Sequence, residues 1–176
     1  PKTNIVSRGM DASNYVYSFK NKITSLEKFN DVTAGIGTIS YLDSPDAVLR
    51  SVPIVLKIDG DIWPALSLES LRVLHGHKSI LINSDETGIN LIKTRKYQIE
   101  PDPNAIVYIN YKEFNKENYI PAVDVLNMSV NANKLKNKMV IIGSSAQGLF
   151  DFVKIPNGDV IPGVQTHAHL IENIVN

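Results

Sequence analysis

Apolar runs in this chain are short, and turn sequences separate them. The longest are Val52 to Leu56, which includes one proline, and Met139 to Ile142. Because a helix that spans a bilayer needs about 20 consecutive apolar residues, neither run can cross a membrane. Hydrophobic residues still make up 43% of the 176 residues, which suffices for one globular domain with a real core. That core must therefore be assembled from short strands and amphipathic helices.

Several apolar runs between turns predict short β-strands. Asp59-Gly60 supplies the positive φ values of a tight hairpin turn between predicted strands at Val48 to Ile58, divided by Pro53, and at Asp61 to Trp63. Met139 to Ile142 predicts a strand that is buried on both faces. The other predicted strands are Asn4 to Val6, Tyr15 to Tyr17, Ile36 to Ser40, Ser79 to Asn83, Ile89 to Lys93, Tyr97 to Ile99 and Ala105 to Tyr111.

Helical spacing is clearest in the middle and at the end of the chain. Leu68, Leu71 and His75 recur at intervals of three and four, with Pro64 suited to a first helical turn and Gly76 to a C-terminal stop. The remaining predicted helices are Pro121 to Leu126, Ala132 to Lys136 and Pro162 to Val175. Interleaved strands and helices predict one α/β domain over residues 1–176, with a mixed β-sheet flanked by helices.

Two histidines on the last predicted helix differ in their expected surroundings. At about 100° per residue, the core-facing arc contains Val164, Ala168, Ile171 and Val175. His167 lies on the flank of that arc. It is expected either to be partly buried and bonded to a carbonyl or to contact a ligand or carry a signal, including a pH signal. His169, Gln165 and Glu172 point the other way, so His169 is expected in solvent.

Composition excludes several functional classes. Eighteen basic residues balance eighteen acidic ones, and only Lys134 to Lys138 gathers basic residues, so no nucleic-acid partner is expected. The lack of cysteine excludes disulfides, thiolate metal sites and cysteine nucleophiles, and it suits an oxidising compartment. His75 and His77 flank a helix end, whereas His167 and His169 lie on different helix faces, so no metal site is expected. No sequence motif indicates a cofactor.

A small-residue turn raises the question of serine catalysis. Gly143 to Gly148 follows an apolar run, as a nucleophile elbow does, but the residue two after Ser145 is Gln147 rather than the glycine that an elbow needs. The order Ser145, Asp151, His167 matches such hydrolases, yet it is compressed into one short stretch. The favoured interpretation is a ligand-binding edge, where small residues end a strand and expose backbone N–H groups.

Several segments together resemble the type-2 CHASE domain, a family of extracytoplasmic sensor domains. They are Gly35 to Ser40, Asp43 to Asp46, Leu49-Arg50, Val52 to Ile54, Trp63 to Leu68, Val140 to Ser145, Phe150-Asp151 and Pro162 to Asn173. Their order and spacing carry the resemblance, which covers residues 35–176 and leaves residues 1–34 as a less defined N-terminal part.

The resemblance implies a sensory input domain of a membrane-bound signalling receptor, periplasmic or extracellular and typical of bacteria. Such a domain is not itself an enzyme and carries no cofactor. Its implied partners are a small-molecule or protein signal, the membrane helices and intracellular catalytic domain of the same chain, and a second copy in a homodimer. The favoured output is an adenylate or guanylate cyclase, with a sensor histidine kinase as the alternative. From other classes, a serine hydrolase and a ligand-free dimerisation module stay open.

Two departures from the family pattern stand out. Ala47 takes the place of a usual glycine, and Arg50 is followed by Ser51 where the family usually has a second arginine. The usual upstream segment, with its own strands, is not found, so the N-terminal part of the domain is expected to be missing. That loss would leave a sheet edge exposed.

Residues at the matching positions are the candidates for ligand binding. They are Arg50, Ser144, Ser145, Asp151 and His167. Asp151 is alternatively expected to cap the turn after Gly148. Trp63 is expected to anchor the core.

Arg50 also has a structural interpretation. It is expected either to pair with an anionic ligand or, as the favoured alternative, to form a salt link to Asp43 or Asp46. Ser44-Pro45 between these aspartates predicts an ordinary turn.

Overall fold

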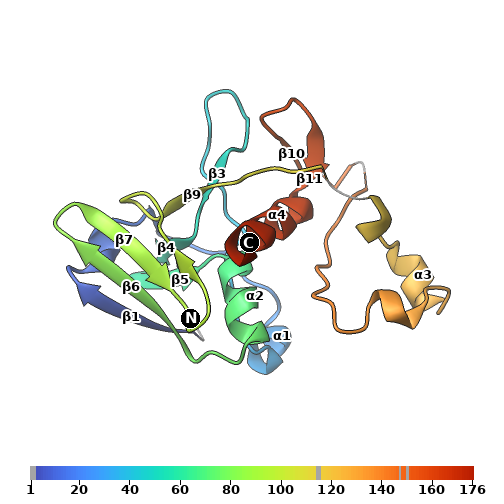
Figure 1. Ribbon diagram of the computed structural model, residues 1–176, viewed down its shortest axis with the longest axis horizontal. Helices are drawn as coiled ribbons and strands as arrows, with labels where there is room; N and C mark the ends of the chain where they lie inside the picture. The colour runs from blue at the N-terminus through green and yellow to red at the C-terminus, as the bar shows by residue number, and fades with distance from the viewer. Residues whose placement is uncertain (1–2, 114–115, 147, 150) are drawn as a thin grey trace.

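The computed structural model describes residues 3–113, 116–146, 148–149 and 151–176. Gln147 and Phe150, which entered the elbow and family comparisons, lie outside the described residues. Most strands lie on one side of helices α2 and α4, with β10 and β11 above α4, and residues 116–146 project on the other side (Figure 1). These residues are called the arm below.

Most predicted strands are present, although several are shorter or shifted. The strands are β1 (Asn4–Gly9), β2 (Ser18–Phe19), β3 (Ser51–Pro53), β4 (Val55–Ile58), β5 (Asp61–Pro64), β6 (Ser79–Asp85), β7 (Gly88–Lys93), β8 (Gln98–Ile99), β9 (Ile106–Tyr108), β10 (Phe152–Lys154) and β11 (Val160–Pro162). The α-helices are α1 (Glu27–Val32), α2 (Leu66–Leu74), α3 (Ala122–Leu126) and α4 (Gly163–Val175). Short 3₁₀ helices span Ala12–Asn14, Lys116–Asn118 and Ala132–Lys134.

The strands form several small sheets rather than one. The largest has the order β1-β6-β7-β8, with β1 parallel to β6 and the other pairs antiparallel. A second has the order β2-β4-β5 and is also mixed. The pairs β3-β9 and β10-β11 complete the set. The α/β class and the mixed pairing are confirmed.

The hairpin predicted at Asp59-Gly60 joins β4 to β5. Asp59 has φ 51° and Gly60 has φ 90°, so both central residues adopt the left-handed conformations that this turn requires. Pro53 ends β3, and the chain then changes sheets, because β3 pairs with β9 whereas β4 pairs with β5. The predicted division of Val48 to Ile58 is therefore confirmed. Pro64 ends β5, so the prediction that it opens helix α2 is wrong.

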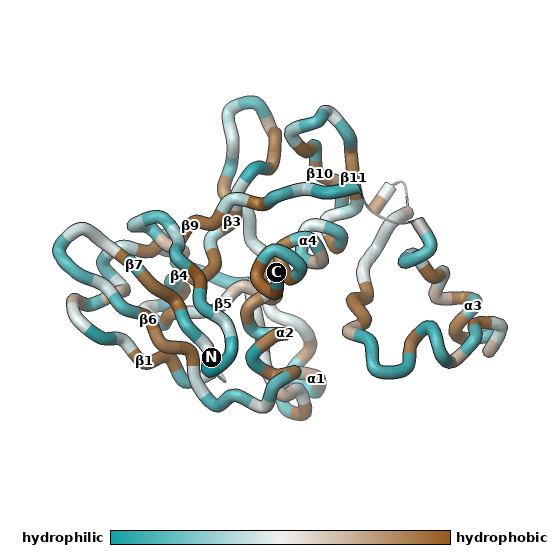
Figure 2. The backbone as a smooth tube through the Cα atoms, viewed as in Figure 1, coloured by the Kyte–Doolittle hydropathy of each residue, from teal (hydrophilic) through white to brown (hydrophobic). Residues whose placement is uncertain are grey.

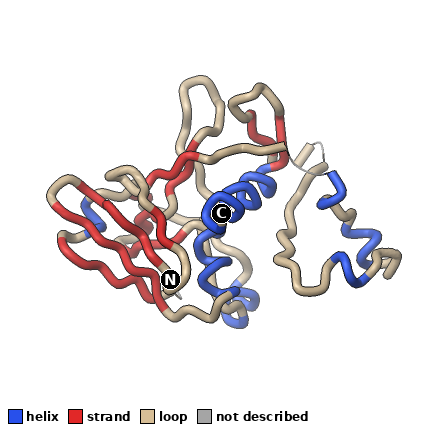
Figure 3. The backbone as a smooth tube through the Cα atoms, in the orientation of Figure 1, coloured by secondary structure: helices blue, strands red, loops and turns tan. Residues whose placement is uncertain are grey.

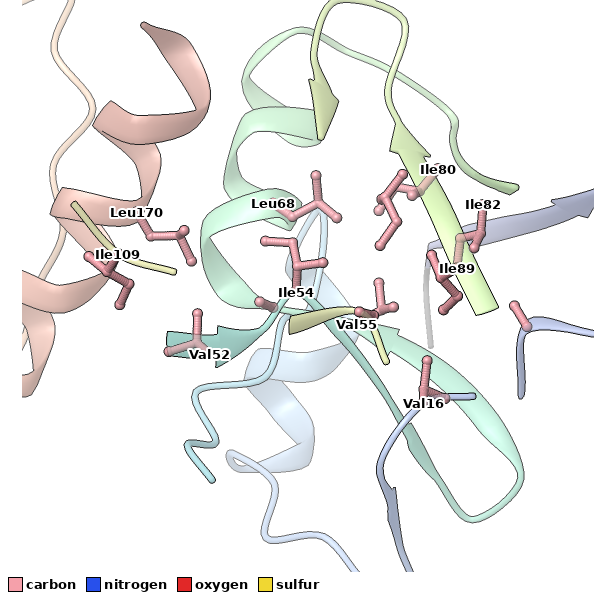
Figure 4. Packing of buried hydrophobic residues seen from close by; sticks show 14 of the residues in the cluster. Val16, Val52, Ile54, Val55, Leu68, Ile80, Ile82, Ile89, Ile109 and Leu170 are labelled. Atoms are coloured by element: carbon pink, nitrogen blue, oxygen red, sulfur yellow. The ribbon is translucent and has the colours of Figure 1, made fainter. Parts of the chain in front are cut away.

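One hydrophobic core lies between the sheets and the two long helices. Figure 4 shows ten of its side chains converging: Val16, Val52, Ile54, Val55, Leu68, Ile80, Ile82, Ile89, Ile109 and Leu170. Adjacent residues of β4 face opposite ways, so Val55 joins this core whereas Leu56 joins Trp63 and Ile58 in a smaller cluster. Trp63 is 7% exposed, which confirms it as a core residue.

The arm contradicts the prediction of a buried strand at Met139 to Ile142. No strand forms there, and Val140 and Ile142 are 55% and 91% exposed. Within the described residues this segment pairs with no strand, and an unpaired strand has no ladder to stabilise it. Met139 lines an open groove beside α2 with Leu74. Helical and loop segments alternate along the arm (Figure 3).

Two other strand predictions are also wrong. Tyr15 to Tyr17 forms a turn after the first 3₁₀ helix, and β2 begins one residue later. Between residues 36 and 40 only Thr38 pairs, through a single bridge to Ala65. Each run makes only isolated backbone contacts with a neighbouring strand, since Tyr17 O accepts from Lys57 N of β4 and Thr38 N donates to Pro64 O of β5. Gly76, with φ 63°, follows α2 closely and confirms the predicted stop.

Candidate functional site

Helix α4 buries polar side chains on a face that its sequence pattern does not predict. Five side chains of α4 are buried, with exposed fractions of 8%, 1%, 7%, 1% and 3% for Gln165, Thr166, His167, His169 and Leu170. Helix α4 packs against α2 (Figure 1), and Tyr111, which follows β9, contacts His169 on another side. The prediction that His169 lies in solvent is wrong because more than one face of the helix is covered.

His167 is surrounded by polar groups from three other segments. Its Nδ1 is 3.3 Å from the hydroxyl of Ser67 on α2. Its ring stacks on Tyr41 with centroids 6.1 Å apart. Burial lowers the His167 pKa, while the charge of Asp151 opposes that shift. The expected partial burial is confirmed, but the partner is a hydroxyl rather than a carbonyl.

Three hydroxyl groups gather beside this histidine. Tyr41 donates to the carbonyl of Gly163 at 3.2 Å, and burial raises its pKa to about 12. Burial also raises the pKa of Tyr111, and the nearby Thr166 hydroxyl lowers the pKa of both phenols. Among the described residues, the hydroxyl oxygens of Thr166 and Tyr111 are buried without a hydrogen-bond partner. Buried groups of this kind are costly unless water or a ligand satisfies them.

His169 belongs to a second polar group on α4. Its Nε2 is 3.2 Å from the Gln165 amide nitrogen, and Tyr119 donates a hydrogen bond to the Gln165 amide oxygen. The ring also meets Tyr111 edge-on, with centroids 5.3 Å apart. Burial lowers the His169 pKa, and Glu172 opposes the shift. Because the amide N–H faces Nε2, that nitrogen acts as an acceptor, so this contact favours neutral imidazole.

The structure brings Asp151 and His167, two of the predicted site residues, into one cluster. Asp151 lies at the start of α4, where its carbonyl accepts from Gly163 N at 2.9 Å. A side chain at Gly163 would meet the Asp151 carboxylate, since an added Cβ would lie 2.3 Å from Oδ1. A carboxylate at a helix N-terminus is favourable.

Ser144 and Ser145 lie in the loop that leads toward α4. Ser144 is half-buried and Ser145 is exposed. Gly143 packs closely on Val164, the second residue of α4. Within the described parts of the chain, neither serine hydrogen-bonds to His167, whose hydroxyl neighbour is the fully buried Ser67. The geometry gives the hydrolase alternative no nucleophile-base pair.

Arg50 lies apart from the cluster and forms the salt link favoured above. Its guanidinium donates to both carboxylate oxygens of Asp46, at 2.9 and 2.7 Å, and this contact is the main cause of a lowered Asp46 pKa. The turn before it closes with Ala47 N donating to Ser44 O, and Ala47 has φ 54°. That left-handed conformation explains why glycine suits this position.

Tyr41, Ser67, Tyr111 and Thr166 are cluster members that sequence reasoning missed. Only Ser67 and Thr166 fall within segments that carry the family resemblance. The tyrosines come from segments that are distant from α4 in the sequence, and no local pattern predicts that they contact this helix. The described residues contain no group of three or more His, Asp or Glu side chains placed to hold a metal ion. None of the helices in the described ranges has the length and apolar character that a membrane span requires.

Comparison with known families gives one match. The sequence model of the CHASE2 domain matches residues 4–176, and so includes the N-terminal stretch that the resemblance above leaves out. No match was found among curated proteins or among solved structures. CHASE2 domains are sensory domains of signalling receptors. The chain belongs to the CHASE2 domain family.

Proposed function

We propose that this chain is the extracytoplasmic input domain of a membrane-bound bacterial receptor. The family match carries the proposal, because CHASE2 domains are sensor modules rather than catalytic ones. The favoured output is an adenylate or guanylate cyclase domain inside the cell, with a histidine kinase as the alternative. Transmembrane helices of the same chain would connect the two sides.

The polar cluster on α4 is the proposed place where the signal is read. The buried hydroxyls of Thr166 and Tyr111 make no hydrogen bond of good geometry among the described residues, so a ligand group or a change in packing that satisfies them would stabilise one arrangement of the helix. His167 joins this helix to α2 through Ser67. A shift in the cluster therefore changes how α4 packs on the rest of the molecule.

Membrane topology of the parent protein tests this proposal. Coding DNA on both sides of the chain is read for apolar runs of about 20 residues. Protease is then added to intact spheroplasts of the source cells. We expect flanking spans, an intracellular catalytic domain and cleavage within the input domain. Soluble flanks, or protection that ends only when the membrane is opened, would contradict the proposal.

Homodimerisation through the arm is a second proposed property. Apolar residues recur along the arm (Figure 2), and several are exposed, including Leu126 at 80%, Met128 at 91% and Ile142 at 91%. Contiguous exposed apolar surface marks association sites. Light scattering during gel filtration should give a dimer that Ile142→Ser weakens. A monomer at every concentration of the wild-type chain would rule it out.

A further inference from the structure

Basic residues gather at one end of the two central strands of the four-stranded sheet, although the chain as a whole is neutral. The turn from β6 to β7 holds Asp85 and Glu86. At the other end of the same two strands, Lys78 precedes β6 and Lys93 ends β7, with Arg95 two residues further on. The net charge of the chain is zero, yet this end of strands β6 and β7 forms a strongly positive edge.

That positive edge is hollowed into an open pocket of about 600 Å³. Its lining contains basic and imidazole side chains and no carboxylate: His75, His77, Lys78, Lys93 and Arg95, with Gly76, Ser79, Leu81 and Thr94. Small-molecule sites typically occupy about 300–1,000 Å³, so the space is larger than a lone inorganic ion needs.

The cations of the pocket have no acidic partner within the described residues. The ion pairs found there involve Lys22, Arg50 and Arg72, and none involves Lys78, Lys93 or Arg95. These three are exposed. The positive field also reaches the imidazole of His75, because Lys96 and His77 add to burial in lowering its pKa. Such unneutralised charge attracts anions.

Hydrogen bonds fix the first wall of the pocket before any ligand binds. The His77 carbonyl accepts from the Arg72 guanidinium at 2.5 Å, and Arg72 is itself held by the buried carboxylate of Glu69 at 2.6 Å. The Nδ1 atom of His77 is buried without a hydrogen-bond partner among the described residues.

The opposite wall is fixed by its own turn. Thr94 N donates to the Tyr97 carbonyl at 2.9 Å, and Tyr97 N donates to the Thr94 hydroxyl at 3.0 Å. The Tyr97 hydroxyl lies 2.9 Å from Nε2 of His75 and so ties the two walls together. Preorganised walls reduce the ordering cost of binding.

We propose that this pocket binds a phosphate group, carried either by a soluble phosphate compound or by a lipid headgroup. Several cations around one space favour a multiply charged anion, and the planar fork of Arg95 matches phosphate oxygens. The pocket is formed mainly by residues 75–79 and 93–95, and none of these residues belongs to the α4 cluster. The site does not depend on the function proposed for that cluster.

Titration with pyrophosphate tests the soluble source. Binding to the 176-residue chain is followed by calorimetry and by backbone amide NMR signals of residues 75–79 and 93–95. We expect saturable binding that shifts those signals and weakens as salt is added. The variant Lys78→Gln/Lys93→Gln/Arg95→Gln should bind at least tenfold more weakly. Circular dichroism checks that it stays folded, as its exposed positions predict.

A matched control removes the same charge elsewhere. The variant Lys134→Gln/Lys136→Gln/Lys138→Gln loses three cations from the arm, outside the proposed site, and should bind pyrophosphate as the wild type does. An equal loss of pyrophosphate binding in both variants would mean that net charge alone causes the effect, and would overturn the proposed site.

Vesicles distinguish the lipid source. Phosphatidylcholine vesicles with and without phosphatidylglycerol are sedimented with the chain. Binding to anionic vesicles alone, lost in the pocket variant, would support the site and assign it to lipid headgroups. Pyrophosphate binding without vesicle binding would assign it to a soluble compound. If neither probe binds saturably, the proposal is wrong.

Discussion

Similar apolar sequences form different structures in the arm and in the rest of the molecule, which is called the body below. In β6, Ile80 and Ile82 are fully buried between β1 and β7. In the arm, the equally apolar Ile142 is 91% exposed. An apolar run becomes a strand only when an edge is available to pair with it and a layer to cover it. The contrast shows that an apolar sequence favours burial, while the neighbouring strands and helices determine whether the segment is buried.

Among the changes predicted here, breaking the buried ion pair of the body should lower the free energy of unfolding most. Glu69 and Arg72 are 2% and 8% exposed and are 2.6 Å apart. Removing one partner leaves an uncompensated buried charge, so Arg72→Ala should lower the free energy of unfolding by about 3–5 kcal/mol. Urea unfolding measures the change. The exposed Arg50–Asp46 pair is the control, and Arg50→Ala should have only a small effect.

Truncating an apolar side chain compares the two regions directly. Leu68 is fully buried, so Leu68→Ala should cost about 2–5 kcal/mol of unfolding free energy. Leu126 in the arm is 80% exposed, so Leu126→Ala should change it by about 0.5 kcal/mol or less. Equal losses in urea unfolding would mean that the arm is packed in solution and that the contrast is false.

Acidification should weaken the body through its buried histidines. Burial holds the pKa values of His167 and His169 below the usual value of about 6.5. The unfolded chain therefore binds protons first, and stability that is complete above about pH 6.5 is lost as pH falls through the lowered pKa values. The melting temperature should drop between pH 7.5 and 5.5.

The variant His167→Asn sharpens that pH prediction. It should reduce the drop in melting temperature, because one group that resists protonation in the folded state is gone. His75→Asn is the comparison, since its half-buried ring lies near solvent and its contribution is screened. A pH dependence unchanged by His167→Asn would show that this histidine is already protonated or exposed.

Relief of backbone strain should give the smallest effect. Ala47 has φ 54°, a region that costs a residue with a Cβ about 1–2 kcal/mol. Glycine removes this cost but has more freedom to lose on folding, so Ala47→Gly should raise the free energy of unfolding by about 0.5 kcal/mol. Thermal unfolding measures it, and a clear loss of stability would contradict the assigned turn.

Local signals predicted much of the fold. Asp59-Gly60 fixes a hairpin through its own backbone preferences, and the helix ending at Leu74 carries its apolar stripe and a glycine stop within its own sequence. The division at Pro53 is equally local. What depends on distant partners was missed: the single bridge at Thr38, and the unpaired Met139 to Ile142.

The candidate site was predicted only in part, for the same reason. His167 was singled out because it matches the family pattern, and its flank position predicted partial burial, but the arc predicted to face the core is less buried than Gln165 and His169 on the other face. Tyr41, however, reaches α4 from more than a hundred residues away and hydrogen-bonds to Gly163. The burial of His169 depends on Tyr111, which packs on the helix from the end of another strand. No pattern within α4 contains that information.

The most direct test of the proposed role of α4 is the output of the proposed parent receptor when the α4 cluster is altered. Cyclic nucleotide production, or autophosphorylation if the output is a kinase, is measured in membranes that contain equal amounts of wild type, His167→Asn, Thr166→Val and Arg50→Gln. The account predicts that both α4 variants shift basal output severalfold, while Arg50→Gln matches the wild type. Equal output from all four proteins would contradict the claim that this helix carries the signal.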